Sequence, residues 1–154
     1  MNGLNRFCSP LRYFSENQGE TEMHKPARIV LIVEDEPLIR LLLADMLEEA
    51  GFAIIEAGSV LEAVGILGLR SDIDAVFTDV DMPGGLSGID LAKMVAGTSP
   101  HIGVVVTSGR ADICRSELPA EARFLPKPYN TMIAVSSVQS VIEKTTHLRA
   151  TRAC

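Results

Sequence analysis

The feature that most constrains the fold is a run of β-branched and aliphatic residues within residues 28–33, which opens a repeating alternation of strand and helix patterns. A strand without a polar face is typical of a sheet that is covered on both sides. Pro37 follows shortly, at a position that suits the first turn of a helix, and Gly51 stands where that helix would end. The chain therefore begins with a strand–helix unit of the kind that builds parallel sheets.

The same alternation continues to the end of the chain. Further strands are predicted at residues 52–56, 74–78, 102–106 and 123–125, and helices at Pro37, after Ser59, at Gly88 and after the capping residue Asn130. The first helix is predicted to bury Ile39, Leu42, Leu43, Met46, Leu47 and Ala50. Residues 110–122 contain Pro119 and no apolar stripe, which predicts a stunted or irregular helix. Five strands alternating with helices predict an α/β fold with a mostly parallel sheet and helices on both faces.

The length and the charge limit the classes of function. The chain has 154 residues, which is enough for one domain and too few for a catalytic domain with a separate DNA-binding module. With 14 Lys and Arg against 20 Asp and Glu, the formal net charge is −6. An acidic chain gains nothing from the counterion release that drives nucleic-acid binding, so we expect no direct contact with nucleic acid.

The termini and the cysteines give expectations about organisation and location. We expect residues 1–26 to form a flexible extension, residues 27–145 the folded domain and residues 146–154 a C-terminal tail. Met23 is an alternative start of the chain. The three cysteines, Cys8, Cys114 and Cys154, match no metal-ligand spacing, and no apolar run is long enough for a signal peptide or a membrane span. A cytoplasmic protein with free thiols and no membrane contact is expected.

Chemically reactive side chains follow four of the five predicted strands. They are Glu34 and Asp35 after the first, Asp79 after the third, Thr107 and Ser108 after the fourth, and Lys127 after the fifth. Each has an ordinary structural explanation when taken alone: helix capping for the acid pair, the end of a strand before a turn for Asp79, turn formation for the hydroxyl residues, and a solvated surface position for the lysine. Ligands of open parallel sheets bind outside the carboxyl ends of the strands. All of these residues are expected at that edge, and their occurrence together there favours a functional site.

Electrostatics indicates what this site would hold. Two carboxylates about 4 Å apart repel each other by roughly 4 kcal/mol at an effective dielectric constant near 20. Three such groups therefore require a cation, and oxygen ligands on short loops suit Mg²⁺. A carboxylate nucleophile beside Mg²⁺, a lysine and a hydroxyl is the apparatus of phosphoryl transfer.

At these positions the sequence resembles the response-regulator receiver domains of bacterial two-component signalling, of the chemotaxis-regulator type. The resemblance covers residues 27–145 and is carried by VEDEP, FTDVDMPG, VVTSG and FLPKPY, which follow or span the ends of the first, third, fourth and fifth strands. It implies a flavodoxin-like receiver fold with the strand order 2-1-3-4-5. It also implies a stand-alone, non-enzymatic response regulator that catalyses only its own phosphorylation and dephosphorylation.

The resemblance assigns roles residue by residue. Asp79 would be the phospho-acceptor, and Mg²⁺ would be held by Asp35, Asp79 and the backbone carbonyl of Asp81, with Glu34 acting through water. Thr107 would be the switch hydroxyl, with Ser108 beside it, and Lys127 would bind the phosphoryl group. Phe124 would be the aromatic switch residue, and the bond to Pro128 would be cis.

Three departures from the usual pattern stand out. The loop at residues 82–88 is one residue longer than usual, Asp81 is acidic where its side chain can influence attack by water, and residues 110–122 are short. The last departure places the usual fourth helix in doubt.

Three functions are distinguished. The first is a phospho-acceptor switch that takes phosphate from a sensor histidine kinase or a phosphotransfer protein and acts on a downstream protein effector, as a monomer or weak dimer. The second is a haloacid-dehalogenase-type phosphatase that uses Asp79 and Asp81, although its Asp-x-Asp motif should follow the first strand. The third is a binding module with a receiver fold that does not use phosphate.

Overall fold

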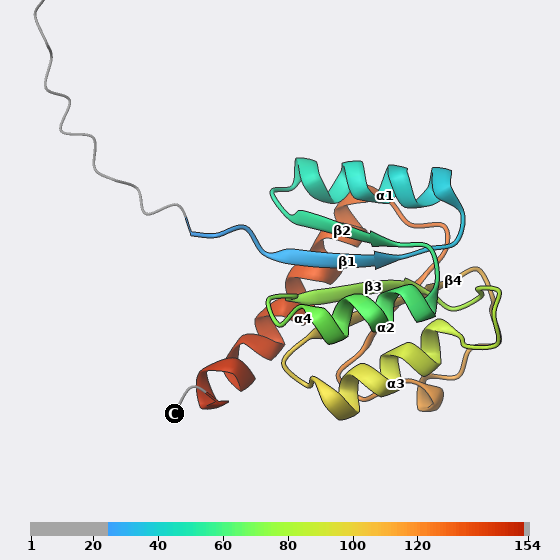
Figure 1. Ribbon diagram of the computed structural model, residues 1–154. Coiled ribbons are helices and arrows are strands. Elements are labelled where there is room, and N and C mark those ends of the chain that lie inside the picture. The colour runs from blue at the N-terminus through green and yellow to red at the C-terminus, as the bar shows by residue number, and fades with distance from the viewer. Residues whose placement is uncertain (1–24, 153–154) are drawn as a thin grey trace, which may run out of the picture.

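The computed structural model describes residues 25–152, which form five strands, four α-helices and one 3₁₀ helix (Figure 1). In chain order the elements are β1 (Ile29–Val33), α1 (Pro37–Glu49), β2 (Ala53–Ala57), α2 (Val60–Leu69), β3 (Ala75–Asp79), α3 (Gly88–Thr98), β4 (Gly103–Ser108), η1 (Arg115–Glu117), β5 (Arg123–Pro126) and α4 (Thr131–Arg152). All five strands lie within two residues of their predicted positions.

The strands form one parallel sheet in the order β2-β1-β3-β4-β5, as the resemblance implied. Their carboxyl ends therefore share one edge of the sheet. The winding direction reverses between β1 and β3, and the crevice outside these two strand ends is where such sheets bind ligands.

Helices cover both faces of the sheet, as predicted. Alternate residues of β1 point to opposite sides: Val30 and Ile32 pack in the cluster with α1 and α4, and Leu31 and Val33 pack in the cluster with α2 and α3. The prediction of a strand buried on both faces is confirmed, since these four side chains are fully buried.

Helix α1 begins and ends close to the predicted residues, but its buried face differs from the prediction. Gly51 follows it with a φ of +96°, which favours glycine. The buried residues are Leu43, Ala44 and Leu47, whereas Leu42, predicted to be buried, is 59% exposed. The helix carries more large apolar residues than the sheet covers, so periodicity alone did not identify the buried ones.

The connection between β4 and β5 contains only the single turn η1. The prediction of an irregular segment at residues 110–122 is confirmed. Leu118 and Ala122 bury their side chains there and attach the segment to the α2 and α3 side of the core.

Helix α4 continues to Arg152, so residues 146–152 are its last turns and not the predicted tail. Arg149 explains this difference: its Nη1 lies 2.8 Å from Asp74 Oδ1, and its Nη2 donates to the carbonyl oxygen of Ile73 at 2.6 Å. Asp74 is buried directly before β3, where it also pairs with Arg28 at 3.1 Å. The predicted N-terminal extension lies outside the described residues, apart from Lys25 and Pro26, and so do Met23, Cys8 and Cys154.

Two further observations bear on the predicted properties. Cys114 is an exposed free thiol. Among residues 25–152, no helix has both the length and the apolar character needed to cross a bilayer.

Candidate functional site

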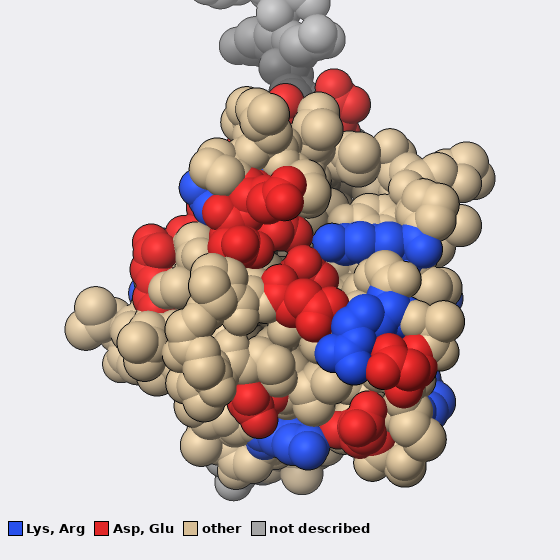
Figure 2. Space-filling model, turned by 90° about the vertical axis from the view of Figure 1, so that its right-hand side faces the viewer, with Lys and Arg blue, Asp and Glu red and all other residues tan. Residues whose placement is uncertain are grey.

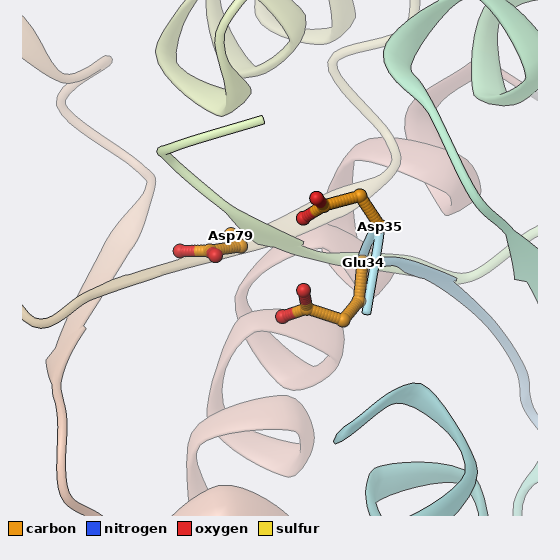
Figure 3. Close-up of side chains that lie close together, drawn as sticks. All are labelled: Glu34, Asp35 and Asp79. Atoms are coloured by element: carbon orange, nitrogen blue, oxygen red, sulfur yellow. The ribbon is translucent and has the colours of Figure 1, made fainter. Parts of the chain in front are cut away.

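Three carboxylates meet at the carboxyl ends of β1 and β3. Glu34 and Asp35 directly follow β1, and Asp79 is the last residue of β3. The two strands are neighbours with Val33 opposite Thr78, so the next residues of each strand lie at the same level. One ligand oxygen from each of the three residues lies within 4.8 Å of the others, and the carboxylates turn toward the same side (Figure 3). We call these three residues the acidic cluster.

Lys127 supplies a positive charge to the acidic cluster. Its Nζ lies 3.3 Å from Asp79 Oδ2 and 3.7 Å from Glu34 Oε2. The residue directly follows β5, and its backbone N–H donates to the carbonyl oxygen of Ser108 at 2.9 Å. The bond between Lys127 and Pro128 is cis, as the resemblance implied. The edge of the sheet that carries the site has acidic side chains near its centre with basic side chains beside them (Figure 2).

Glu34 is the most deeply buried carboxylate of the cluster, with a side chain that is 5% exposed. Burial raises the pKa of Glu34 above its usual value, and the nearby charge of Asp79 raises it further. The backbone N–H of Glu36, which donates to Glu34 Oε1 at 3.1 Å, and the charge of Lys127 lower the pKa of Glu34 and oppose this effect. The three carboxylates of the acidic cluster thus carry more negative charge than Lys127 alone neutralises.

This raised pKa leads to a prediction about stability in metal-free protein. The folded state keeps the Glu34 proton at pH values where the unfolded chain has lost it, so proton binding to Glu34 favours the folded state. This contribution to the free energy of unfolding is complete below the unfolded pKa of 4.5 and is lost as the pH rises through the folded pKa. We expect Glu34→Gln to remove this loss. Urea unfolding with a chelator, from about pH 4.5 upward, would measure it, with Glu143→Gln, an exposed position on α4, as the control. Identical pH dependence of wild type and Glu34→Gln would contradict the prediction.

The acidic cluster fits a hard divalent cation. Its donors are carboxylate oxygens, and its negative charge is only partly balanced by one lysine. Asp35 and Asp79 would hold Mg²⁺ directly with the backbone carbonyl of Asp81, and Glu34 would act through water.

A thermal prediction tests this fit. Mg²⁺ at about ten times its Kd should stabilise the wild type by about 1.4 kcal/mol. In chelator, Asp35→Asn should be more stable than the wild type by about 1 kcal/mol, because it relieves repulsion among the three carboxylates. This gain corresponds to an increase of about 4 °C in Tm. The variant should also lose the response to Mg²⁺. Asp45→Asn, at an exposed position on α1, is the control, and a wild-type Tm that is independent of Mg²⁺ would contradict the fit.

The hydroxyl residues at the end of β4 lie next to the end of β3. Thr107 is opposite Asp79 in the sheet register and is 2% exposed. Within the described part of the chain, its Oγ1 is one of two buried side-chain polar atoms without a hydrogen-bond partner. A buried hydroxyl without a partner costs free energy, so Thr107 would gain from an acceptor brought close to it. Phe124 is half-buried and packs on the α2 and α3 side of the core.

Three residues that the sequence did not single out also shape the site. Arg40 of α1 donates from Nη1 to the carbonyl oxygen of Glu34 at 2.7 Å and pairs with Glu56, which fixes the backbone that carries the acid pair. Gly88 packs against the backbone of Asp79. The rings of Tyr129 and Phe77 pack edge to face, with 5.8 Å between their centroids. Burial and the charges of Glu34 and Asp79 raise the pKa of Tyr129 to about 12. No local pattern marks these contacts, although Tyr129 belongs to the FLPKPY motif.

Comparisons with known proteins agree with this geometry. The family model for the response regulator receiver domain matches residues 30–139. The sensor kinase CckA of Brucella abortus is 36% identical over 119 residues, which are 75% of this chain and 12% of that protein. The transcriptional regulatory protein PdtaR of Mycobacterium tuberculosis is 35% identical over 120 residues, which are 76% of this chain and 58% of that protein. The chain thus spans less than two thirds of these relatives.

Solved structures show the same fold. A response regulator receiver domain protein from Clostridium thermocellum has a TM-score of 0.70 and 26% identity, covering 79% of this chain and 98% of that one. The receiver domain of the hybrid histidine kinase CckA has a TM-score of 0.62 and 30% identity, covering 74% and 98%. The strand order, the acidic cluster and the family match agree, and the chain belongs to the response regulator receiver domain family.

Proposed function

We propose that this receiver domain accepts a phosphoryl group on Asp79 from a histidine kinase or a phosphotransfer protein and signals through protein contacts that depend on phosphorylation. The observation that carries the proposal is the surroundings of Asp79. Its carboxylate ends a central strand, lies with two other carboxylates in a cluster suited to Mg²⁺, and is 3.3 Å from the ammonium group of Lys127.

The transfer step follows from these positions. An Asp79 carboxylate oxygen attacks the phosphorus of a phosphohistidine, and the P–N bond breaks. Its electron pair returns to the imidazole nitrogen, which takes a proton from solvent, so that histidine leaves as the neutral imidazole. Lys127 binds one phosphoryl oxygen and offsets its charge. Mg²⁺, when bound by the acidic cluster, supplies further neutralisation of the phosphoryl charge. The chain's own contribution is to hold the nucleophile, the ammonium group and the metal ligands at one edge of the sheet.

The signal would arise from Thr107. Phosphorylation places about −1.5 to −2 of charge and three acceptor oxygens at Asp79, on the strand next to Thr107. The unpartnered Thr107 hydroxyl then has an acceptor and moves toward it, and Phe124 fills the space that it leaves. These movements would alter the surface around β4 and β5, where a downstream protein would bind.

Incubation with Mg²⁺ and a small acyl phosphate tests the proposal. The mass of the intact protein should increase by one phosphoryl group, and a chelator should prevent the increase. No gain by a folded protein would instead favour a binding module that does not use phosphate. Repeated turnover of a phosphate monoester would favour a phosphatase that uses Asp79 and Asp81.

A further inference from the structure

An ion pair lies at the rim of the proposed acceptor site, and neither the transfer step nor the switch uses it. Arg110, just after β4, places its Nη1 3.3 Å from Oδ1 of Asp81, two residues after the acceptor Asp79. Asp112 holds the same guanidinium through two bonds, from Nε at 3.0 Å and from Nη2 at 2.8 Å. We call Asp81 and Arg110 the rim pair.

Ser108 connects the two members of the rim pair. Its Oγ accepts from the backbone N–H of Arg110 at 3.1 Å and lies 3.4 Å from Asp81 Oδ2, to which it donates. Ser108 is 1% exposed, so this oxygen is fixed by the core at the end of β4. The Asp81 carboxylate therefore has a contact at each of its two oxygens, both from residues that follow Thr107.

Comparison with another surface pair shows what is particular to this arrangement. Arg70 and Asp72 have the same spacing as Arg110 and Asp112 and the same two bonds, at 2.9 and 2.7 Å. Only Arg110 extends its second terminal nitrogen to a carboxylate on the loop that follows the acceptor strand. Its fork with Asp112 holds the guanidinium in place for this contact.

We propose that Arg110 is a positioning residue that prolongs the phosphorylated state by holding the Asp81 carboxylate at the rim. This inference rests on the proposed function. In the loss of phosphate, a water oxygen bonds to phosphorus and the bond from phosphorus to the Asp79 oxygen breaks. Asp79 regains its carboxylate, and both water protons leave with the phosphate as dihydrogen phosphate. A carboxylate two residues from Asp79 that is free to turn would accept a hydrogen bond from that water and orient it. The Asp81 carboxylate, held by Arg110 at one oxygen and by Ser108 at the other, is not free to turn toward it.

The expected effect is moderate because both side chains of the rim pair are about half exposed, at 52% and 53%. Exposed ion pairs are weak, so loss of the pair increases the fraction of time during which the Asp81 carboxylate is free by only a few-fold. Protein loaded with an acyl phosphate in Mg²⁺ and then freed of donor should lose its phosphoryl group about threefold faster in Arg110→Ala than in the wild type. Arg70→Ala, which removes the matched pair elsewhere, should leave the rate unchanged.

Two further measurements separate positioning from a merely structural role. Adding Asp81→Asn to Arg110→Ala should cancel the acceleration, because no carboxylate remains to orient water, whereas general damage to the site would persist. About 1 M salt should reduce the difference between Arg110→Ala and the wild type, because it screens the exposed pair in the wild type.

The outcomes distinguish the inference from the proposed function. If the wild type takes up no phosphoryl group, the proposed function fails and this inference fails with it. If it does, equal or slower loss in Arg110→Ala, or an acceleration that Asp81→Asn does not cancel, overturns the role of Arg110 and leaves the function of Asp79 standing.

Discussion

Replacement of Asp79 by asparagine is expected to abolish phosphorylation by a small acyl phosphate completely while preserving the fold. An amide nitrogen or oxygen does not replace the carboxylate nucleophile, and no other member of the acidic cluster ends a strand opposite Thr107. Intact-protein mass spectrometry measures the uptake. The thermal melt in chelator should show a Tm equal to or above that of the wild type, because the substitution removes one of the three negative charges.

Asp45→Asn is the matched control for this variant. It makes the same chemical change at an exposed position on α1, and it should take up one phosphoryl group as the wild type does. Uptake by Asp79→Asn at the wild-type level would place the acceptor at another residue and would contradict the assignment.

Gly88→Ala is expected to be the most destabilising single substitution near the site. A Cβ at Gly88 would collide with the carbonyl oxygen of Asp79, and it would lie 2.8 Å from the carbonyl carbon of Asp79 and 2.9 Å from Thr78 Oγ1. Overpacking of this kind costs about 3 kcal/mol. The backbone of Asp79 would have to move, so phosphorylation should slow by roughly tenfold or more. Urea unfolding and the rate of mass gain measure the two effects.

Gly97→Ala provides the comparison within the same helix, α3. An added Cβ there has no atom within 4 Å, so the substitution should stabilise the protein by roughly 0.5–1 kcal/mol through helix propensity. A Gly88→Ala variant as stable and as reactive as Gly97→Ala would show that the close approach to Asp79 is not required.

Much of the fold and of the candidate site could be predicted because it depends on neighbouring residues. The run within 28–33 predicts a buried strand by its composition alone, and Pro37 and Gly51 mark the limits of a helix by their backbone preferences. The position of Asp79 at a strand end, together with the common direction of parallel strands, was sufficient to place it near Glu34.

The remaining features could not be predicted from local patterns. Helix α1 has apolar residues on more than one face, and only packing against the sheet decided that Leu42 stays exposed. The length of α4 depends on Arg149 reaching Asp74, a residue 75 positions earlier in the chain. The exposed turns after residue 145 had no apolar stripe to indicate that they continue a helix.

The sequence by itself determined the alternation of strands and helices and the identity of the side chains at the strand ends, because both are properties of contiguous residues. Only the tertiary structure decided how those side chains are held: the contact of Arg40 with the backbone of Glu34, the unpartnered hydroxyl of Thr107 and the rim pair of Asp81 and Arg110. Such contacts join segments that are far apart along the chain. They depend on distances that exist only after the strands have paired and the loops at their carboxyl ends have been brought together.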